Sequence, residues 1–364
     1  MPGSTTDSTG LGCRQIRLVR IAHVYYTHKN IDQARQFLED FGFHEVKRVG
    51  KDTYYRGTGP EPFVYCARQG DEDDFGGAAF VVESEQDLEY AAQTLPNATK
   101  VYELSDAPGG GRCVTFRDPV DNFPFHLVYG QAAAENVTAF PQLKFNFVCP
   151  APVHKLGHFG MCVTNFAKTF EFYTTRFNFV PSDLVYDKSG RDITTFLHLD
   201  RGSELVDHHC FFFFEGPKSH VHHSSYETHD FDTQVLGHDW LRRKGYENCW
   251  GVGRHIMGSQ IFDYWFDPSR FILEHYVDGD LVNDANPVNR SPASPDNLHV
   301  WGSIQLRLKN LLVGGGVGGM ESADVHSCQV VQYWEYETRV LDTWAHYPDR
   351  FKTPSINFSD IKLD

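Results

Sequence analysis

The stretch that decides the fold reads LGHFGMCV, from Leu156 to Val163, and leads into NFAKTFEFYTTRFNF, from Asn165 to Phe179. Successive side chains of a strand alternate between its two faces, so one face of the first segment is apolar and the other carries His158. The second segment repeats aromatic residues at the spacing of one helical stripe, and Asn165 is suited to cap that helix. The members of the stripe are Phe166, Phe170, Tyr173 and Phe177.

The same strand-then-helix pattern occurs near the start of the chain. IAHVYY, from Ile21 to Tyr26, leads into NIDQARQFLEDFGF, from Asn30 to Phe43. In both copies the capping asparagine follows seven residues after a strand histidine, His23 in the first and His158 in the second. Such self-similarity indicates that the chain is built from repeated units.

The two copies also end alike, in an Asp-Pro turn followed by a terminal strand. These endings are residues 116–129 and 266–276, and further strand–helix starts lie at 76–82 and 222–227. Four βαβββ units then fill two halves, which predicts an α+β fold: two domains, each of paired βαβββ modules that form a curved open barrel. The expected limits are 17–135 and 150–280, with a C-terminal extension at 281–364.

The extension differs in composition from the repeats. Residues 283–297 are rich in Asn, Pro and Ser, and 314–319 are nearly all glycine. Trp301 and residues 306–313 could cover part of a site, or the segment could be a disordered or oligomer-contacting tail. Both interpretations stay open on the sequence.

Charge and cysteine usage narrow the class of protein. The 364 residues carry 33 Lys+Arg against 48 Asp+Glu, a formal net charge of -15, which argues against a nucleic-acid or anionic-membrane surface. The eight cysteines include no C-x-x-C pair, and neither a signal peptide nor a membrane span is apparent. We therefore expect a reducing, cytoplasmic location.

Three segments place candidate metal ligands at strand positions. His158 lies on the face opposite the apolar one, and His222 and His223 are adjacent, so at most one of them should face the same cavity. Glu274 alternates with apolar residues, and a buried carboxylate is costly without compensation. Two imidazoles and one carboxylate form the facial triad of non-heme Fe(II) oxygenases, which leaves open coordination positions. Singly, each is as well explained as a buried polar group, and Glu274 could pair with Arg254.

The motifs around these residues resemble those of type I extradiol ring-cleavage dioxygenases (catechol 2,3-dioxygenase-like) of the vicinal oxygen chelate, or glyoxalase–bleomycin resistance, superfamily. The motifs are LGHFGM, HHSSYE and GRHIMGSQIFDYWFDPSRFILEHY. The resemblance extends over residues 17–280 as a repeat pattern and is sharpest over 156–276. It implies that Fe(II), with Mn(II) as the alternative ion, is bound by His158, His223 and Glu274.

The resemblance also implies further site residues. His208 is expected to act as an acid and base near the metal, with the adjacent His209 as the alternative if the register differs by one. His255 and Tyr264 are expected to hydrogen-bond a substrate oxygen. The remaining histidines of the His-rich run are expected to be bystanders, on the other face or in loops: His220, His222 and His229.

The first half departs from the ligand pattern. Gly77 stands at the position that matches His223, and His126 at the one that matches Glu274. Only His23 is retained, and one side chain does not make an iron site. We expect this half to be a scaffold that binds no metal.

The resemblance implies an oxidoreductase that cleaves the ring of a catechol next to its vicinal hydroxyls with O2, in a homo-oligomer. Two other functions on the same fold stay open. A glyoxalase-like isomerase would use four protein ligands and zinc or nickel, and a non-catalytic aromatic-ligand-binding protein would generally lack the triad. The substituents of the catechol and the choice of proximal or distal cleavage cannot be read from the sequence.

Overall fold

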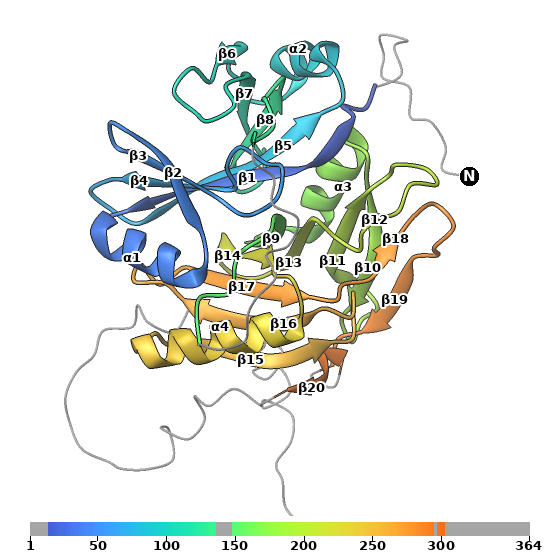
Figure 1. The fold of residues 1–364 in the computed structure, drawn as a ribbon. Coiled ribbons are helices and arrows are strands. Elements are labelled where there is room, and N and C mark those ends of the chain that lie inside the picture. The colour runs from blue at the N-terminus through green and yellow to red at the C-terminus, as the bar shows by residue number, and fades with distance from the viewer. Residues whose placement is uncertain (1–13, 136–147, 295–296, 303–364) are drawn as a thin grey trace, which may run out of the picture.

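Four strand–helix–strand units build the molecule, two in each half of the chain (Figure 1). The computed structural model describes residues 14–135, 148–294 and 297–302. The elements of the first half are β1 (Leu18–His28), α1 (Ile31–Phe41), β2 (His44–Val49), β3 (Asp52–Arg56) and β4 (Tyr65–Gln69), then β5 (Asp74–Val82), α2 (Glu85–Thr94), β6 (Tyr102–Glu103), β7 (Arg112–Arg117) and β8 (Pro124–Tyr129).

The second half repeats this order and adds short strands. Its elements are β9 (Leu156–Val163), α3 (Phe166–Arg176), β10 (Phe179–Tyr186), β11 (Asp192–Leu199), β12 (Val206–Asp207) and β13 (Phe211–Glu215), then β14 (His220–Glu227), α4 (Phe231–Lys244), β15 (Asn248–His255), β16 (Ile261–Phe266) and β17 (Ile272–Val277), then β18 (Leu281–Val282), β19 (Asn289–Pro292) and β20 (His299–Gly302). The predicted α+β fold of paired βαβββ modules is confirmed. The domain limits drawn on the sequence stay a prediction.

Each half forms one large curved sheet. The first has eight strands in the order β2-β3-β4-β1-β5-β8-β7-β6, and the second has ten in the order β19-β10-β11-β13-β9-β14-β17-β16-β15-β20. The first strands of the two units lie side by side and antiparallel in both sheets, as β1 with β5 and β9 with β14. This symmetry places β9, β14 and β17 next to one another near the middle of the second sheet.

The helices begin where their capping residues predict. The side chain of Asn165 accepts the backbone N–H of Lys168 at 3.1 Å, and that of Asn30 accepts the N–H of Gln33 at 3.3 Å. An N-cap oxygen satisfies one of the N–H groups that a helix start leaves without a partner. In α1 the apolar residues at helical spacing are all buried: Ile31, Ala34, Leu38 and Phe41.

Aromatic side chains fill the contact between the two sheets. Phe159 of β9 lies 6.0 Å from Phe75, 6.1 Å from Phe80 and 5.6 Å from Phe125, measured between ring centroids. It also stacks on Phe211 of β13 at 4.8 Å. The apolar face predicted for this strand therefore packs against the first half of the chain, and its other face is left to line the interior of the second sheet.

The chain beyond Asp280 extends the second sheet. β19 pairs in parallel with β10, and β20 pairs antiparallel with β15, at opposite edges. Trp301 is 42% exposed and contacts Phe231, whereas Leu298 reaches the cavity of the second half. Residues 306–313 and 314–319 lie outside the described residues. In the described part, no helix has the length and apolarity that crossing a membrane requires.

A buried carboxyl lies where the halves meet. Asp267 follows β16 and accepts the backbone N–H of Phe271 at 2.8 Å, while Nδ1 of His28 in β1 lies 3.9 Å from its Oδ2. Burial raises the pKa of the Asp267 carboxyl to about 8 and lowers the pKa of His28 to about 4. Both groups are therefore held in their neutral forms near pH 6.

Asp267 should give stability a pH dependence that Asp267→Asn reduces. Its folded-state pKa lies above the unfolded value near 4, so its contribution is complete below about pH 4 and is lost as the pH rises toward 8, by up to about 1.4 kcal/mol per pH unit. His28 acts in the opposite sense in both proteins. From pH 5 to pH 7, urea unfolding should show the wild-type free energy of unfolding falling by roughly 2 kcal/mol more than that of the variant. Equal slopes would contradict the burial argument.

Candidate metal centre

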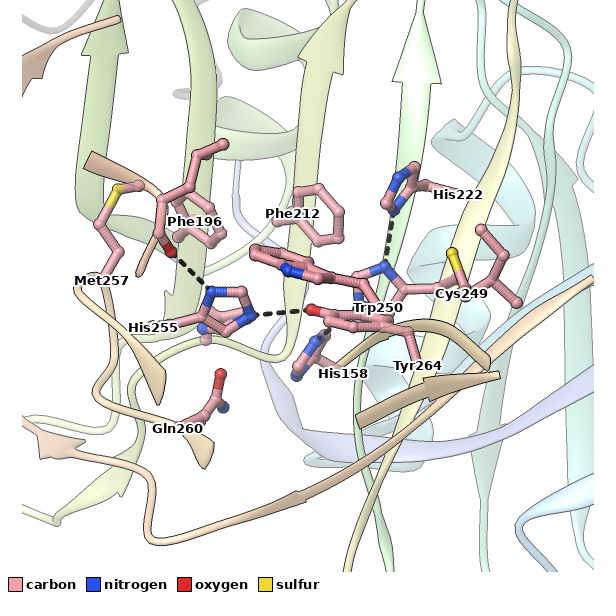
Figure 2. A pocket seen from close by; sticks show the side chains of 14 residues that line it. His158, Phe196, Phe212, His222, Cys249, Trp250, His255, Met257, Gln260 and Tyr264 are labelled. Atoms are coloured by element: carbon pink, nitrogen blue, oxygen red, sulfur yellow. Dashed lines mark hydrogen bonds between the residues drawn. The ribbon is translucent and has the colours of Figure 1, made fainter. Parts of the chain in front are cut away.

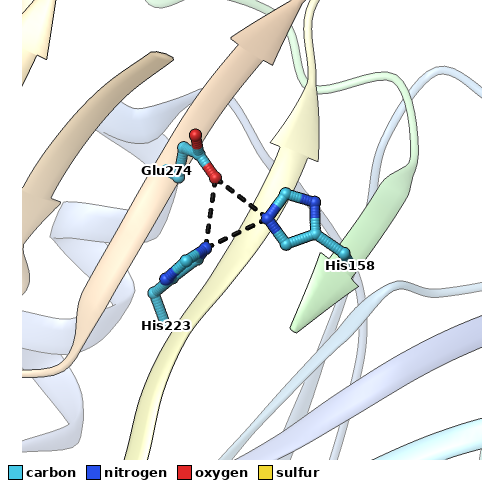
Figure 3. Close-up of side chains that lie close together, drawn as sticks. All are labelled: His158, His223 and Glu274. Carbon is cyan, nitrogen blue, oxygen red and sulfur yellow. Dashed lines mark hydrogen bonds and ion pairs between the residues drawn. The ribbon is translucent and has the colours of Figure 1, made fainter. Parts of the chain in front are cut away.

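Three buried side chains converge on one point of the second sheet (Figure 3). Nε2 of His158 lies 3.0 Å from Nε2 of His223, and each of these atoms lies 3.2 Å from Oε2 of Glu274. The three residues come from β9, β14 and β17, which are neighbours in the sheet. They are the one group of three or more His, Cys, Asp or Glu side chains, within the described residues, that is placed to hold a metal ion.

The pairing of the strands explains why these side chains meet. Ser225 of β14 pairs with His158 on one side and with Glu274 on the other, and Glu274 pairs in turn with Tyr264 of β16. Directly paired residues present their side chains on the same face of a sheet. His223 lies two residues before Ser225 and shares that face, because side chains on a strand alternate.

The donor set fits a divalent cation. Glu274 is fully buried, and neither of its carboxylate oxygens has a hydrogen-bond partner of good geometry in the described part of the chain. Burial raises the pKa of this carboxyl, but contact with His158 and His223 outweighs burial and holds the pKa well below its ordinary value. Burial lowers the pKa of His223. An ionised carboxylate and a neutral imidazole are the forms that bind metals, and separations near 3 Å suit ligands roughly 2.1 Å from one ion.

Arg254 does not provide the alternative partner for Glu274. Its guanidinium donates to Asp278 at 2.6 Å and to the backbone carbonyl of Ser259 at 2.6 Å. The ion pair between Glu274 and Arg254 that the sequence left open is therefore absent. The Glu274 carboxylate points at the imidazoles of His158 and His223 instead.

His222 faces the cavity, which contradicts the expectation that it is a bystander. The register of β14 against β9 shifts between Val221 and His223, so His222 is the extra residue of a β-bulge. The bulge turns two adjacent side chains toward the same cavity, and simple alternation therefore fails here. Nδ1 of His222 lies 2.7 Å from Nδ1 of His223, so His222 contacts the outer nitrogen of a candidate ligand (Figure 2). Such contacts orient metal-binding imidazoles.

His209, rather than His208, lies against the candidate ligands. The ring of His209 is 4.2 Å from that of His158 between centroids, and it lines the cavity. His208 points to the far side, where its Nε2 lies 2.7 Å from Oδ2 of Asp183. The resemblance to a family favoured His208 from its spacing, with His209 as the alternative if the register differed by one, and the structure places the alternative against the candidate ligands.

His255 and Tyr264 are brought together beside the candidate ligands. Nδ1 of His255 lies 2.9 Å from the carbonyl oxygen of Leu298, and its Nε2 lies 2.9 Å from the Tyr264 hydroxyl (Figure 2). Burial lowers the pKa of His255 to about 4, so the ring is neutral. A carbonyl can only accept, so Nδ1 carries the proton and Nε2 accepts the hydroxyl proton of Tyr264. The Tyr264 ring also meets the ring of His223 edge-on at 5.0 Å.

An apolar, largely aromatic cavity opens beside the three candidate ligands. Trp250 stacks on Tyr264 at 5.7 Å, and Gly160 lets Phe212 lie across β9, because a Cβ there would overlap the Phe212 ring. No Lys or Arg is among the described residues that line the cavity. Lining residues that the sequence did not single out are Phe196, Phe212, Cys249, Trp250, Met257, Gln260, Ile272 and Leu298.

The equivalent region of the first half is filled by its own side chains. His23 stacks on Phe63 at 3.9 Å, and its Nε2 lies 3.0 Å from the Tyr25 hydroxyl. His126 contacts the Thr115 hydroxyl at 2.9 Å and the Gly76 carbonyl at 2.9 Å. A metal-free role for this half stays a prediction.

Comparisons with known proteins find relatives of the segment that carries the three candidate ligands. The sequence model of the Glyoxalase/Bleomycin resistance protein/Dioxygenase superfamily matches residues 155–274. Metapyrocatechase 2 of Cupriavidus necator is 25% identical over 212 residues, which are 58% of this chain and 55% of that protein. The match therefore spans little more than half of that relative's length. A biphenyl-2,3-diol 1,2-dioxygenase of Metapseudomonas furukawaii is 27% identical over 254 residues, 68% of this chain and 80% of that protein.

Solved structures share the fold over about four fifths of the chain. The Mn(II)-bound glyoxalase from Novosphingobium aromaticivorans superposes with a TM-score of 0.70 at 22% identity, over 80% of this chain and 94% of that one. Homoprotocatechuate 2,3-dioxygenase from Brevibacterium fuscum does so with a TM-score of 0.67 at 17% identity, over 79% and 89%. The chain therefore has the two-module vicinal oxygen chelate fold, and its residues 155–274 belong to the Glyoxalase/Bleomycin resistance protein/Dioxygenase superfamily.

Proposed function

We propose that the protein is an extradiol dioxygenase, which opens the aromatic ring of a catechol next to its two hydroxyls with O2. The observation that carries the proposal is the convergence of His158, His223 and Glu274 beside an aromatic cavity. Three protein ligands on one side of an ion leave positions for a substrate with two vicinal oxygens and for a further small molecule. The names of the curated relatives, metapyrocatechase and biphenyl-2,3-diol dioxygenase, support the same reaction class.

The three candidate ligands would hold Fe(II), or Mn(II) as the alternative, and the ion would supply the electron transfer between the catechol and O2. The protein's own groups bind and orient the substrate. The Tyr264 hydroxyl donates to His255, so its oxygen would accept a hydrogen bond from a catechol hydroxyl and pass its own proton on to Nε2 of His255 as the catechol proton moves onto it. His209 lies against the ring of His158, where an imidazole is suited to accept or return a proton.

The cavity lining favours a catechol with an apolar, uncharged substituent. Phe196, Phe212 and Trp250 offer ring faces, and the described lining has no cation to pair with a carboxylate. Burying an ionised carboxylate without a partner costs several kcal/mol, and about 1.4 kcal/mol corresponds to a factor of ten in binding. Aryl- or alkyl-substituted catechols should therefore be preferred to carboxylated ones.

Anaerobic reconstitution with Fe(II), followed by a panel of catechols in air, tests the proposal. We expect one O2 consumed per catechol and the absorbance of a yellow ring-opened product. For a phenyl-substituted catechol, kcat/KM should exceed that for a carboxymethyl-substituted one by at least about 100-fold. Equal values would refute the substituent preference, and no O2 uptake with any catechol would refute the dioxygenase.

A metal-dependent isomerase is the second candidate, because the Mn(II)-bound glyoxalase superposes well. Within the described residues no fourth His, Cys, Asp or Glu joins the three candidate ligands, which weighs against a four-ligand site. Isomerisation with zinc, nickel or manganese and without O2 uptake would favour it. Tight aromatic-ligand binding without turnover would favour the binding protein. A homo-oligomer and a cytoplasmic location stay predictions.

A further inference from the structure

A chain of hydrogen-bonded side chains leads from the candidate metal centre to a buried carboxylate in β10. Nδ1 of His209 lies 3.1 Å from Nδ1 of His208, and Nε2 of His208 lies 2.7 Å from Oδ2 of Asp183. All three residues are buried. The structure places Asp183 and His208 away from the candidate ligands, yet both continue the row that begins at His209.

The carboxylate fixes the position of every proton in this chain. A carboxylate only accepts, so Nε2 of His208 must carry a proton, and in a neutral imidazole its Nδ1 is then an acceptor. The contact at 3.1 Å is a hydrogen bond only if Nδ1 of His209 donates. Nε2 of His209, which makes no hydrogen bond within the described part of the chain, is left as the acceptor toward the cavity that this ring lines.

We propose that Asp183 and His208 are positioning residues that keep the ring proton of His209 on Nδ1 and so present Nε2 to the cavity as a proton acceptor. The inference deepens the proposed function and rests on it, because an acceptor beside the candidate ligands is of use when a catechol hydroxyl is bound there. It assigns a tautomer and no change of charge.

Hydrogen bonds from neighbouring side chains hold Asp183 and His208 in place. Asn289 of β19 pairs with Asp183 of β10, and its Nδ2 donates to Oδ1 of Asp183 at 2.5 Å. The hydroxyl of Ser182 donates to the backbone carbonyl of His208 at 2.6 Å and lies 2.6 Å from Nδ1 of His198. Through Asn289, β19 thus binds the carboxylate oxygen of Asp183 that is not bonded to His208. A polar cavity of about 440 Å³ borders the same residues, separate from the aromatic one.

Asp183→Asn tests the proposal because Asn289 dictates how the new amide sits. The Nδ2 group of Asn289 needs an acceptor, so the oxygen of the new amide would turn toward it and the amide N–H would face His208. Nε2 of His208 would become an acceptor, its Nδ1 a donor, and the proton of His209 would move to Nε2. The double variant with Asn289→Asp places an acceptor at position 289 and should return the original tautomer.

The direct readout is the ¹⁵N chemical shift of the His209 ring in the full-length protein, metal-free and zinc-loaded, assigned by loss of the signal in His209→Gln. We expect Nδ1–H in the wild type, Nε2–H in Asp183→Asn, and Nδ1–H again in the double variant. With Fe(II) and a catechol, kcat should fall on the order of 100-fold or more in Asp183→Asn with little change in KM, and recover in the double variant. Asp192→Asn, which removes a carboxylate bonded to Arg290 at the same edge, should change neither readout.

The outcomes separate this inference from the proposed function. Nε2–H on His209 in the wild type overturns the inference, whatever the Asp183 and Asn289 variants show. An unchanged tautomer in Asp183→Asn, or a restored tautomer without restored kcat, overturns it as well. If no catechol is cleaved at all, the proposed function fails, while the ¹⁵N shifts still decide whether Asp183 sets the tautomer.

Discussion

Glu274→Gln should abolish ring cleavage and metal binding together while leaving the fold intact. The amide has the same shape but lacks the negative charge that balances a divalent cation, and the three donor atoms lie 3.0 to 3.2 Å apart around one point. Removing a residue that only hydrogen-bonds a metal ligand already costs about 10- to 100-fold in metal affinity. Removing the one carboxylate among the three candidate ligands should therefore cost at least about 100-fold. Turnover with Fe(II) and a catechol should fall at least about 1,000-fold.

The variant is checked by measurements that do not depend on turnover. An ion that binds the folded state alone stabilises it by about 2.7 kcal/mol at 100 times its Kd, so Mn(II) or Zn(II) should raise the Tm of the wild type and leave that of Glu274→Gln nearly unchanged. Glu227→Gln is the matched control, because Glu227 is in β14 but pairs with Lys155 away from the ligands. Metal-dependent stabilisation of the Glu274→Gln protein equal to that of the wild type would exclude the proposed ligand set.

Side-chain periodicity was sufficient to locate part of this site. Alternation along two strands put His158 and Glu274 on inward faces, and the structure has both there, in the same row on either side of Ser225 of β14. Such patterns depend only on neighbours in the sequence, so they can be recognised without knowledge of the tertiary fold. The choice of His223 over His222 came from the resemblance to a family and had no basis in periodicity alone.

What the sequence missed depends on register and on distant segments. The bulge that turns His222 inward is a property of how β14 pairs with β9, and the placement of His209 rather than His208 depends on the loop that enters β13. Leu298 joins the cavity through a segment that composition marked as irregular, yet it is carried beside β15 by β20. A residue's partners across a sheet are set by long-range pairing, which local patterns do not encode.

Tyr264→Phe should lower kcat by about 100-fold and change KM by only a few-fold. The Tyr264 side chain shares a face with Glu274, because the two residues pair directly across β16 and β17. Its hydroxyl donates to Nε2 of His255, whose proton is held on Nδ1 by the Leu298 carbonyl. Phenylalanine keeps the ring packing on Trp250 but removes the hydroxyl that would relay a catechol proton to His255, and positioned proton transfer contributes roughly 100- to 10,000-fold to rates.

The hydroxyl and the imidazole should act as one unit, which a double-mutant cycle can measure. If Tyr264 works through its bond to His255, then His255→Gln should lower kcat by a similar factor, and the double variant should be little slower than either single one. Tyr173→Phe is the control, since Tyr173 is also buried in the second half and its hydroxyl has no hydrogen-bond partner among the described residues. Losses that multiply in the double variant would mean that the two groups act separately, and an unchanged kcat in Tyr264→Phe would remove the hydroxyl from the reaction.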